Sequence, residues 1–288
     1  MNNNKVVVGI GEVLWDVFPA GKKLGGAPSN FAFHAAQYGF ESYAVSALGG
    51  DDLGAEILEV LDGKPINKCF PTVDFPTGTV QVTLDEKGIP CYEIMTDVAW
   101  DNIPFTPQIE ALAAKADCVC FGSLAQRSEV SRATISRFVS SMRQEGTLRV
   151  FDINLRQEFY SKEVIESSIK MCNTLKINDD ELELITPMFG LTASSQADRT
   201  AELRKLYDLD MVILTCGTNG SYVFSATESS FLETPIVEVV DTVGAGDSFT
   251  SAFCSSILLG KSIREAHQEA IELSAFVCSQ SGAMPVRR

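Results

Sequence analysis

The sequence predicts an α/β protein built on a mostly parallel β-sheet that helices cover on both faces. The chain opens with a continuous apolar run at 6–10, which is typical of a strand buried on both faces. Strand-like and helix-like segments then alternate, and strands joined by helices of this length form parallel sheets. With 288 residues and 45% hydrophobic content, the chain can bury the core of one large domain.

The βα alternation is visible element by element. A strand-like run at 42–48 separates two helical patterns, one introduced by Gly25-Gly26 and one at 53–61. Apolar segments at 222–224 and 231–232 flank Thr227-Glu228-Ser229 and predict a small hairpin at 221–233. A capping-box spacing predicts that the last helix begins at Ser262. The elements between them are helices at 107–115, 128–145 and 161–172 and strands at 117–122, 148–153 and 174–178.

Residues 77–95 interrupt this alternation with a β-hairpin. Polar and apolar residues alternate at 79–84 and again at 91–95, and Asp85-Glu86-Lys87-Gly88 supplies a turn between them. A hairpin inserted in a βα series usually covers a site or pairs with another subunit. We therefore expect a single domain over 1–288 with a small β insertion around 77–95, to which 12–24 could also belong.

Charge and cysteine content narrow the class of protein. Lys and Arg total 23 against 38 Asp and Glu, a net charge of −15, which argues against binding to nucleic acid or to an anionic membrane. The polar start and the lack of an apolar run of about 20 residues indicate neither signal peptide nor membrane anchor, so we expect a cytoplasmic protein. The eight cysteines show no CxxC spacing, which favours buried thiols. Only His34 and His267 are present, and carboxylates are therefore the candidate bases.

Residues 241–247 carry the strongest chemical signal in the chain. They follow a β-branched run at 236–240 and precede a helical pattern, which indicates a strand-to-helix turn. The glycines leave N–H groups free at a helix start, and such a start binds anions. Asp247 would lie beside a bound phosphate and could accept the proton of an attacking hydroxyl, although helix capping is an alternative use. The helix start is expected to lower the pKa of Asp247.

The N-terminal glycines do not form a dinucleotide-binding fingerprint. The third glycine of that motif is replaced by Leu14, and no helix begins there. The next segment places Asp16 among large apolar residues, where sugar hydroxyls or a structural hydrogen bond would satisfy it. Gly25-Gly26 lets the backbone approach a ligand closely, and Asn30 can donate and accept hydrogen bonds.

Polar clusters follow three further strands, at 152–156, 178–181 and 214–220. Because ligands of parallel sheets bind beyond the C-terminal ends of the strands, we expect these clusters at the same rim as Asp247. Each cluster alone could be a cap or a turn, and for Asn178 capping is an equal alternative.

The chain resembles the ribokinase/PfkB carbohydrate kinase family along almost its whole length. Two signatures carry the resemblance: Gly25-Gly26 and Asn30 with Gly49-Gly50-Asp51, and Asp-Thr-x-Gly-Ala-Gly-Asp-x-Phe at 241–249. Gly-Gly-Ala-Pro at 25–28 replaces the Gly-Gly-Lys-Gly of ribokinases and phosphofructokinases, which favours fructose as substrate. The segments similar to the bacterial fructokinase branch are Gly11-Glu12-x-x-x-Asp16, Gly25-Gly26-Ala27-Pro28-x-Asn30 and Asp152-x-Asn154-x-Arg156.

The resemblance implies a ribokinase-like three-layer α/β/α sandwich with a mostly parallel sheet and a small β lid at 77–95. It implies ATP-dependent phosphorylation of a sugar, with Asp247 as general base and the amides of Gly244, Ala245 and Gly246 as the anion hole. In relatives the lid closes over the sugar and often forms the dimer contact, so a homodimer is expected.

The remaining roles also follow from the resemblance. Glu181 would hold Mg²⁺ through water, and Asp241 and Val243 match positions of a monovalent cation site, such as one for K⁺. The residues matched to the sugar site are Asp16, Gly26, Asn30 and Arg156, and those matched to the nucleotide site are Asn178, Thr215, Gly217, Gly220, Gly246 and Ser279.

Two classes of alternative stay open. The enzyme could act on another neutral sugar, a sugar acid or a nucleoside, such as ribose, 2-keto-3-deoxygluconate or adenosine. From a different class, the chain could be a non-catalytic sugar-binding regulator. The Asp247 and Gly244-Ala245-Gly246 signature argues against the regulator, since a sensor has no need of a base.

Overall fold

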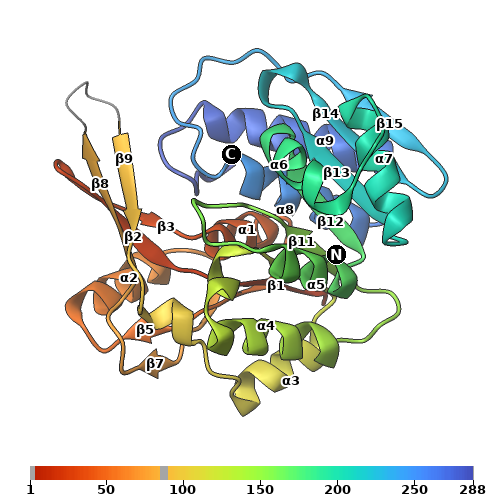
Figure 1. Cartoon of the computed structure of the whole chain (residues 1–288). Helices are drawn as coiled ribbons and strands as arrows, with labels where there is room; N and C mark the ends of the chain where they lie inside the picture. The colour runs from red at the N-terminus through yellow and green to blue at the C-terminus, as the bar shows by residue number, and fades with distance from the viewer. Residues whose placement is uncertain (1–3, 85–89, 288) are drawn as a thin grey trace.

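The main body is a nine-stranded sheet with helices on both faces, shown in Figure 1. The computed structural model describes residues 4–84 and 90–287. Neighbouring strands pair in parallel from β6 to β13, and only β14 and β15 pair antiparallel. The predicted mostly parallel sheet is thus confirmed. The strands in spatial order are β15 (Ser229–Leu232), β14 (Ser221–Ser225), β13 (Met211–Thr215), β12 (Thr174–Asn178), β11 (Leu148–Asp152), β10 (Cys118–Phe121), β1 (Val6–Ile10), β4 (Glu41–Val45) and β6 (Asn67–Cys69).

Two apolar clusters on opposite faces of the sheet make the sandwich. One joins the sheet to the helices of the middle of the chain, and the other joins it to the first helix and the last two, which lie side by side although they are far apart in sequence. This arrangement confirms the predicted three layers. The first face carries α3 (Pro107–Lys115), α4 (Glu129–Ser141), α5 (Lys162–Met171), α6 (Asp179–Phe189) and α7 (Gln196–Leu206), and the second carries α1 (Ala27–Ala36), α8 (Ala245–Leu258) and α9 (Ile263–Cys278).

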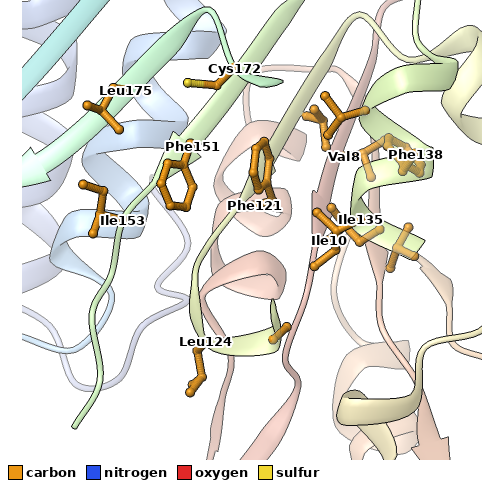
Figure 2. Close-up of a cluster of buried hydrophobic side chains, with 14 of the residues drawn as sticks. Val8, Ile10, Phe121, Leu124, Ile135, Phe138, Phe151, Ile153, Cys172 and Leu175 are labelled. Atoms are coloured by element: carbon orange, nitrogen blue, oxygen red, sulfur yellow. The ribbon is translucent and has the colours of Figure 1, made fainter. Parts of the chain in front are cut away.

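Successive side chains of each strand point to opposite faces of the sheet, so one sheet contributes residues to both clusters. Val8 and Ile10 point to the α4 side, where Phe121 and Phe151 stack with ring centroids 5.3 Å apart (Figure 2). Val7 points to the opposite side. A strand packed on both faces has no polar side, which is why these runs are continuously apolar.

A smaller four-stranded sheet projects from the main body, at the left of Figure 1. It contains both segments that the sequence set apart: the hairpin strands β8 and β9 and the segment around 12–24. The predicted turn at 85–88 lies outside the described residues. The strands in order are β3 (Gly21–Gly25), β2 (Leu14–Phe18), β8 (Thr79–Leu84) and β9 (Pro90–Ile94).

The remaining elements lie near the base of this sheet. Helix α2 spans Asp52–Asp62 and packs with α1 and β4 in a third apolar cluster. A two-stranded sheet pairs β5 (Leu48–Gly49) with β7 (Thr72–Val73). Among the described residues, none of the helices is both long and apolar enough to cross a membrane.

Three element predictions were wrong in whole or in part. No strand forms at 236–240: the segment is irregular, Ile236 is fully exposed, and the backbone N–H of Val240 bonds to the carbonyl of Cys278 instead of to a neighbouring strand. The strand predicted at 42–48 is divided between β4 and β5, and the helix predicted at 128–145 ends at 141.

Candidate active site

The first turn of α8 presents three free backbone donors, whereas the sequence predicted that all four N–H groups from Gly244 to Asp247 would be free. Gly244 is the N-cap residue and no side chain caps the helix. In the described parts of the chain, the N–H groups of Gly244, Gly246 and Asp247 have no acceptor. The N–H of Ala245 differs, because it bonds to the carbonyl of Thr242 at 3.3 Å. The turn therefore keeps three of its four expected donors for an anion.

Only glycine fits at position 244. Its φ is +78°, in the left-handed region, and an added Cβ would lie 2.5 Å from the Cβ of Ala283. The loop after α9 thus packs directly against the turn. This loop is fixed in turn by His34, whose Nε2 lies 2.9 Å from the Ala283 carbonyl oxygen.

Asp247 points away from its own helix start and toward α1. Its Oδ2 accepts a hydrogen bond from Asn30 Nδ2 at 2.8 Å, and the residue keeps part of its surface open. The expected lowering of its pKa is wrong: burial raises the pKa of Asp247 to about 6, although Asn30, Lys176 and Arg156 act in the opposite direction. Desolvation by the surrounding protein is the largest cause, because it disfavours the charged form of the carboxylate. The result is a base that is ionised at neutral pH but holds protons far better than a free Asp.

Two more carboxyl groups lie near this base. Asp16 on β2 is partly buried, and burial raises its pKa while Arg156 and Lys23 lower it. Glu12 is buried at the end of β1, and burial raises its pKa to about 7, with Asp247 raising it further and Arg156 lowering it. Arg156 therefore acts on all three carboxyl groups. The structure brings Asp16, Asn30, Arg156 and Asp247 into one neighbourhood.

The paired glycines let α1 approach this neighbourhood. A Cβ on Gly25 would lie 2.7 Å from Asp16 Oδ2, and a Cβ on Gly26 would lie 2.6 Å from the Glu12 carbonyl oxygen. Both distances are shorter than real Cβ contacts, so a side chain at either position would push α1 away from β2. The predicted role of these glycines in close approach fits this packing.

The loop that carries Arg156 is strained. Asn154 and Gln157, on either side of it, have φ values of 45° and 48°, which non-glycine residues adopt at a cost. Gln157 Nε2 donates to the carbonyl of Tyr92 on β9 at 2.6 Å. The loop after β11 is therefore tied to the projecting sheet, directly beside the carboxyl cluster.

The residues matched to the nucleotide lie further along the same rim. Asn178 and Thr215 are direct neighbours at the ends of β12 and β13. Gly217 and Gly220 follow in a tight turn with φ values of +53° and +96°. Ser279 lies apart from them, at the C-terminal end of α9, and none of the hydrogen bonds of the described residues links it to Asn178 or Thr215.

Asn178 and Glu181 form a capping box at the start of α6. Asn178 Oδ1 accepts the Glu181 N–H at 2.8 Å, and Glu181 Oε2 accepts the Asn178 N–H at 2.9 Å. Glu181 Oε1 accepts the N–H of Leu155, also at 2.9 Å. Capping, left open by the sequence, is thus a real use of both residues. Carboxylate oxygens are ligands that Mg²⁺ prefers, but both oxygens of Glu181 are engaged, so the residue fits a magnesium ion only through water.

Asp241 ties the turn before α8 to the loop after α9. Its carboxylate accepts the N–H of Val243 at 3.0 Å and that of Gly282 at 3.3 Å, and Lys23 Nζ lies 3.3 Å away. These donors hold the pKa of Asp241 below its usual value, although burial raises it. A monovalent ion at Asp241 and Val243 would therefore use backbone carbonyl oxygens. Within the described residues, no three His, Cys, Asp or Glu side chains converge as a metal site.

Sequence reasoning assigned no role to two buried charged residues: Glu12, which it named only as part of a motif, and Lys176, which it did not name. Lys176 lies in the middle of β12, where it is the one charged residue of a strand that is buried up to its last residue, and its Nζ is 3.1 Å from Asp152 Oδ1. Burial lowers the pKa of Lys176, but Asp152, Glu181 and Asp247 raise it, and the net shift is upward. Glu12 similarly ends an apolar run. A charge inside a run that is buried on both faces was the signal available for each.

Comparison with known proteins places this chain in a family. The model of the pfkB family of carbohydrate kinases matches residues 10–287. An ATP-dependent 6-phosphofructokinase from Thermoanaerobacterium thermosaccharolyticum is 29% identical over 271 residues, covering 91% of this chain and 81% of that protein. A fructokinase from Salmonella typhimurium is 27% identical over 268 residues, covering 88% and 85%. The structure of fructokinase from Vibrio cholerae O395 with fructose, ADP and calcium has a TM-score of 0.82 at 20% identity, covering 99% and 96%. The chain therefore belongs to the pfkB family of carbohydrate kinases, and its architecture is the ribokinase-like sandwich of a sugar kinase.

Proposed function

We propose that this kinase transfers the γ-phosphoryl group of ATP to a hydroxyl of fructose. One observation carries the proposal: a carboxylate with a pKa of about 6, Asp247, lies in the first turn of a helix whose N–H donors are free. Asp247 follows the N-cap residue Gly244 by three residues, so the base and the anion-binding N–H groups lie in the same turn. Hydroxyl activation needs the base, and stabilisation of the phosphoryl group needs the N–H donors.

In the proposed reaction the sugar hydroxyl oxygen bonds to the γ-phosphorus as the bond to the ADP oxygen breaks. Asp247 takes the hydroxyl proton, and the N–H groups of Gly244 and Gly246 donate to the phosphoryl oxygens, with Ala245 contributing less because its N–H is already shared. Arg156 lies close to the carboxyl cluster and adds positive charge beside the phosphoryl group. Proton removal is late in such a loose transition state, so positioning matters more than strong basicity.

The nucleotide would occupy the rim beyond β12 and β13, held by Asn178, Thr215, Gly217 and Gly220, with Ser279 beside the adenine. A magnesium ion bound through water to Glu181 would neutralise phosphate charge. A potassium ion near Asp241 and Val243 would support the α8 turn from the other side. Asp16, Gly26 and Asn30 would bind the sugar hydroxyls.

The charges around the sugar residues favour a neutral substrate. Arg156 faces three carboxyl groups, and the nearby lysines Lys22 and Lys23 are paired with Glu56 and Asp241. A sugar that already carries a phosphate would meet an excess of negative charge there. The Ala27-Pro28 sequence after the paired glycines and the fructokinase relatives support fructose among neutral sugars.

The proposal also includes a closing lid, a homodimer and a cytoplasmic location. The four-stranded sheet would close over the sugar, guided by the Gln157 contact to β9, and would form the contact of a homodimer. Tyr92 on β9 is more than half exposed, which fits such a contact. All seven cysteines whose side chains are described are free thiols, which fits the reducing cytoplasm.

An ADP-release assay over a substrate panel tests the proposed function. The panel contains fructose, fructose 6-phosphate, ribose, 2-keto-3-deoxygluconate and adenosine, each with ATP and Mg²⁺. We expect the highest kcat/KM with fructose. Higher kcat/KM with another substrate would reassign the sugar, whereas sugar binding by calorimetry without any turnover would indicate a non-catalytic sugar-binding protein.

A further inference from the structure

A buried ion pair lies beneath the first turn of α8 and is not used by the proposed reaction. Asp152 and Lys176 are direct neighbours across β11 and β12, and Lys176 Nζ lies 3.1 Å from Asp152 Oδ1. Their side chains are only 10% and 8% exposed. Burying two charges is costly, so the pair needs a purpose beyond joining two strands that already share a ladder of backbone hydrogen bonds.

The pair is connected to α8 at two points. Thr250 Oγ1 donates to Asp152 Oδ2 at 3.2 Å and lies 3.0 Å from the carbonyl oxygen of Gly246. On the other side, Lys176 Nζ lies 3.2 Å from the place that a Cβ on Gly246 would occupy. Thr250 is three residues after Asp247, so both lie on the same face of α8. The pair therefore supports the turn that carries the base.

The ammonium group of Lys176 lies between Asp152 and the backbone of this turn. Burial lowers the pKa of Lys176, but the charge of Asp152 and its contact with the ammonium group, 3.1 Å from Asp152 Oδ1, raise it. The lysine is thus a positive charge beside Gly246, and Asp152 is a negative charge on its other side.

We propose that the Asp152–Lys176 pair positions the first turn of α8 and poises Asp247 between two opposing charges. The assignment rests on the proposed role of Asp247 as base. Lys176 favours the ionised form of Asp247 and Asp152 disfavours it, so each partner offsets the other. The other groups that act on Asp247 come from four different segments and are Glu12, Asn30, Cys120 and Arg156.

Titration of Asp247 by carboxyl ¹³C NMR in the substrate-free protein tests the proposal without requiring turnover. Its signal is assigned with Asp247→Asn. We expect Lys176→Met to raise the pKa of Asp247 by about 1 unit and Asp152→Asn to lower it by about 1 unit, with the double variant near the wild-type value. Lys176→Arg should restore the wild-type value. Lys170→Met, at an exposed lysine paired with Glu166, should leave it unchanged.

The two proposals fail in different ways. Wild-type protein that phosphorylates no member of the panel overturns the proposed function, while the titration still reads the effect of the pair. Shifts of the same sign in both single variants, or none in folded protein, overturn the inference. A rise in KM for ATP in Lys176→Met without a shift in the pKa of Asp247 also overturns it, because Lys176 would then be a nucleotide ligand. Should Lys176→Met fail to fold, Asp152→Asn still tests the inference, because an unchanged or raised pKa of Asp247 in that folded variant overturns it.

Discussion

The helices α6 and α8 begin in the same way but use their first turns for opposite purposes. Each carries a carboxylate three residues after its N-cap residue, Glu181 after Asn178 and Asp247 after Gly244. Glu181 bends back and accepts the N–H of Asn178 at 2.9 Å. Asp247 bends away and accepts the amide of Asn30, leaving the N–H groups of its own turn free.

The N-cap residue accounts for the difference. Asn178 has a side-chain oxygen that accepts from its own helix, and the reciprocal bond to Glu181 completes a box. Gly244 has no side chain, and a Cβ at this position would clash with Ala283. A helix start that is satisfied by its own residues stabilises the fold, whereas one that is left unsatisfied is available to a ligand.

Replacing the carboxylate of α8 is expected to have the largest effect. Asp247→Asn keeps the hydrogen-bonding shape but removes the base, so kcat should fall about 10²- to 10⁴-fold. The thermal unfolding temperature should stay the same or rise, because a buried charge is lost. Steady-state kinetics with fructose and a thermal melt measure the two effects. Turnover within a few-fold of wild type would contradict the assignment of Asp247 as base.

The glycine of the α8 turn offers the next largest effect and a matched control in α6. Gly244→Ala must place a Cβ 2.5 Å from that of Ala283 at a φ of +78°, and should cost about 3 kcal/mol of stability together with most turnover. Gly190, at the C-terminal end of α6, has a φ of +65° with nothing near its Cβ position. Gly190→Ala should therefore cost only about 1 kcal/mol. Urea unfolding measures both, and equal losses would mean that the Ala283 contact is unimportant.

The sequence predicts those features of the two helix starts that depend on local patterns, and it does not predict those that depend on contacts between distant segments. Repeated apolar runs predict the sheet, and the spacing of glycines predicts the turn at Gly244, because both are local patterns. The irregular path of 236–240 is not local: its β-branched residues favour a strand, but in the structure the N–H of Val240 bonds to the carbonyl of Cys278 at the end of α9. The raised pKa of Asp247 and the Asp152–Lys176 contact likewise depend on burial by segments distant in sequence.

Replacing the carboxylate of α6 should reverse the effect on stability. Glu181 accepts two backbone N–H groups, from Asn178 and Leu155, and a glutamine has only one oxygen with which to do so. Glu181→Gln should therefore lower the free energy of unfolding by about 2 kcal/mol, whereas Asp247→Asn should not lower it. Chemical denaturation of the two variants side by side makes the comparison. If both variants lost the same stability, the two turns would not differ as inferred.

A third helix start, that of α1, should show the smallest effect. Like α8, it has a glycine N-cap without a side-chain bond, and Glu12 lies beside its first N–H, that of Ala27. The pKa of Glu12 is about 7, above the ordinary 4.5, so the folded protein holds a proton that the unfolded chain releases between these values. Ionised Glu12 thus costs stability above pH 7, and the cost fades as the pH falls toward 4.5. Glu12→Gln should gain about 1 kcal/mol relative to wild type on going from pH 5.5 to pH 6.5. Subtracting the wild-type melts at each pH removes the contribution of His34 and His267, whose lowered pKa values act in the opposite direction. A difference between variant and wild type that does not change with pH would show that Glu12 is already ionised throughout this range.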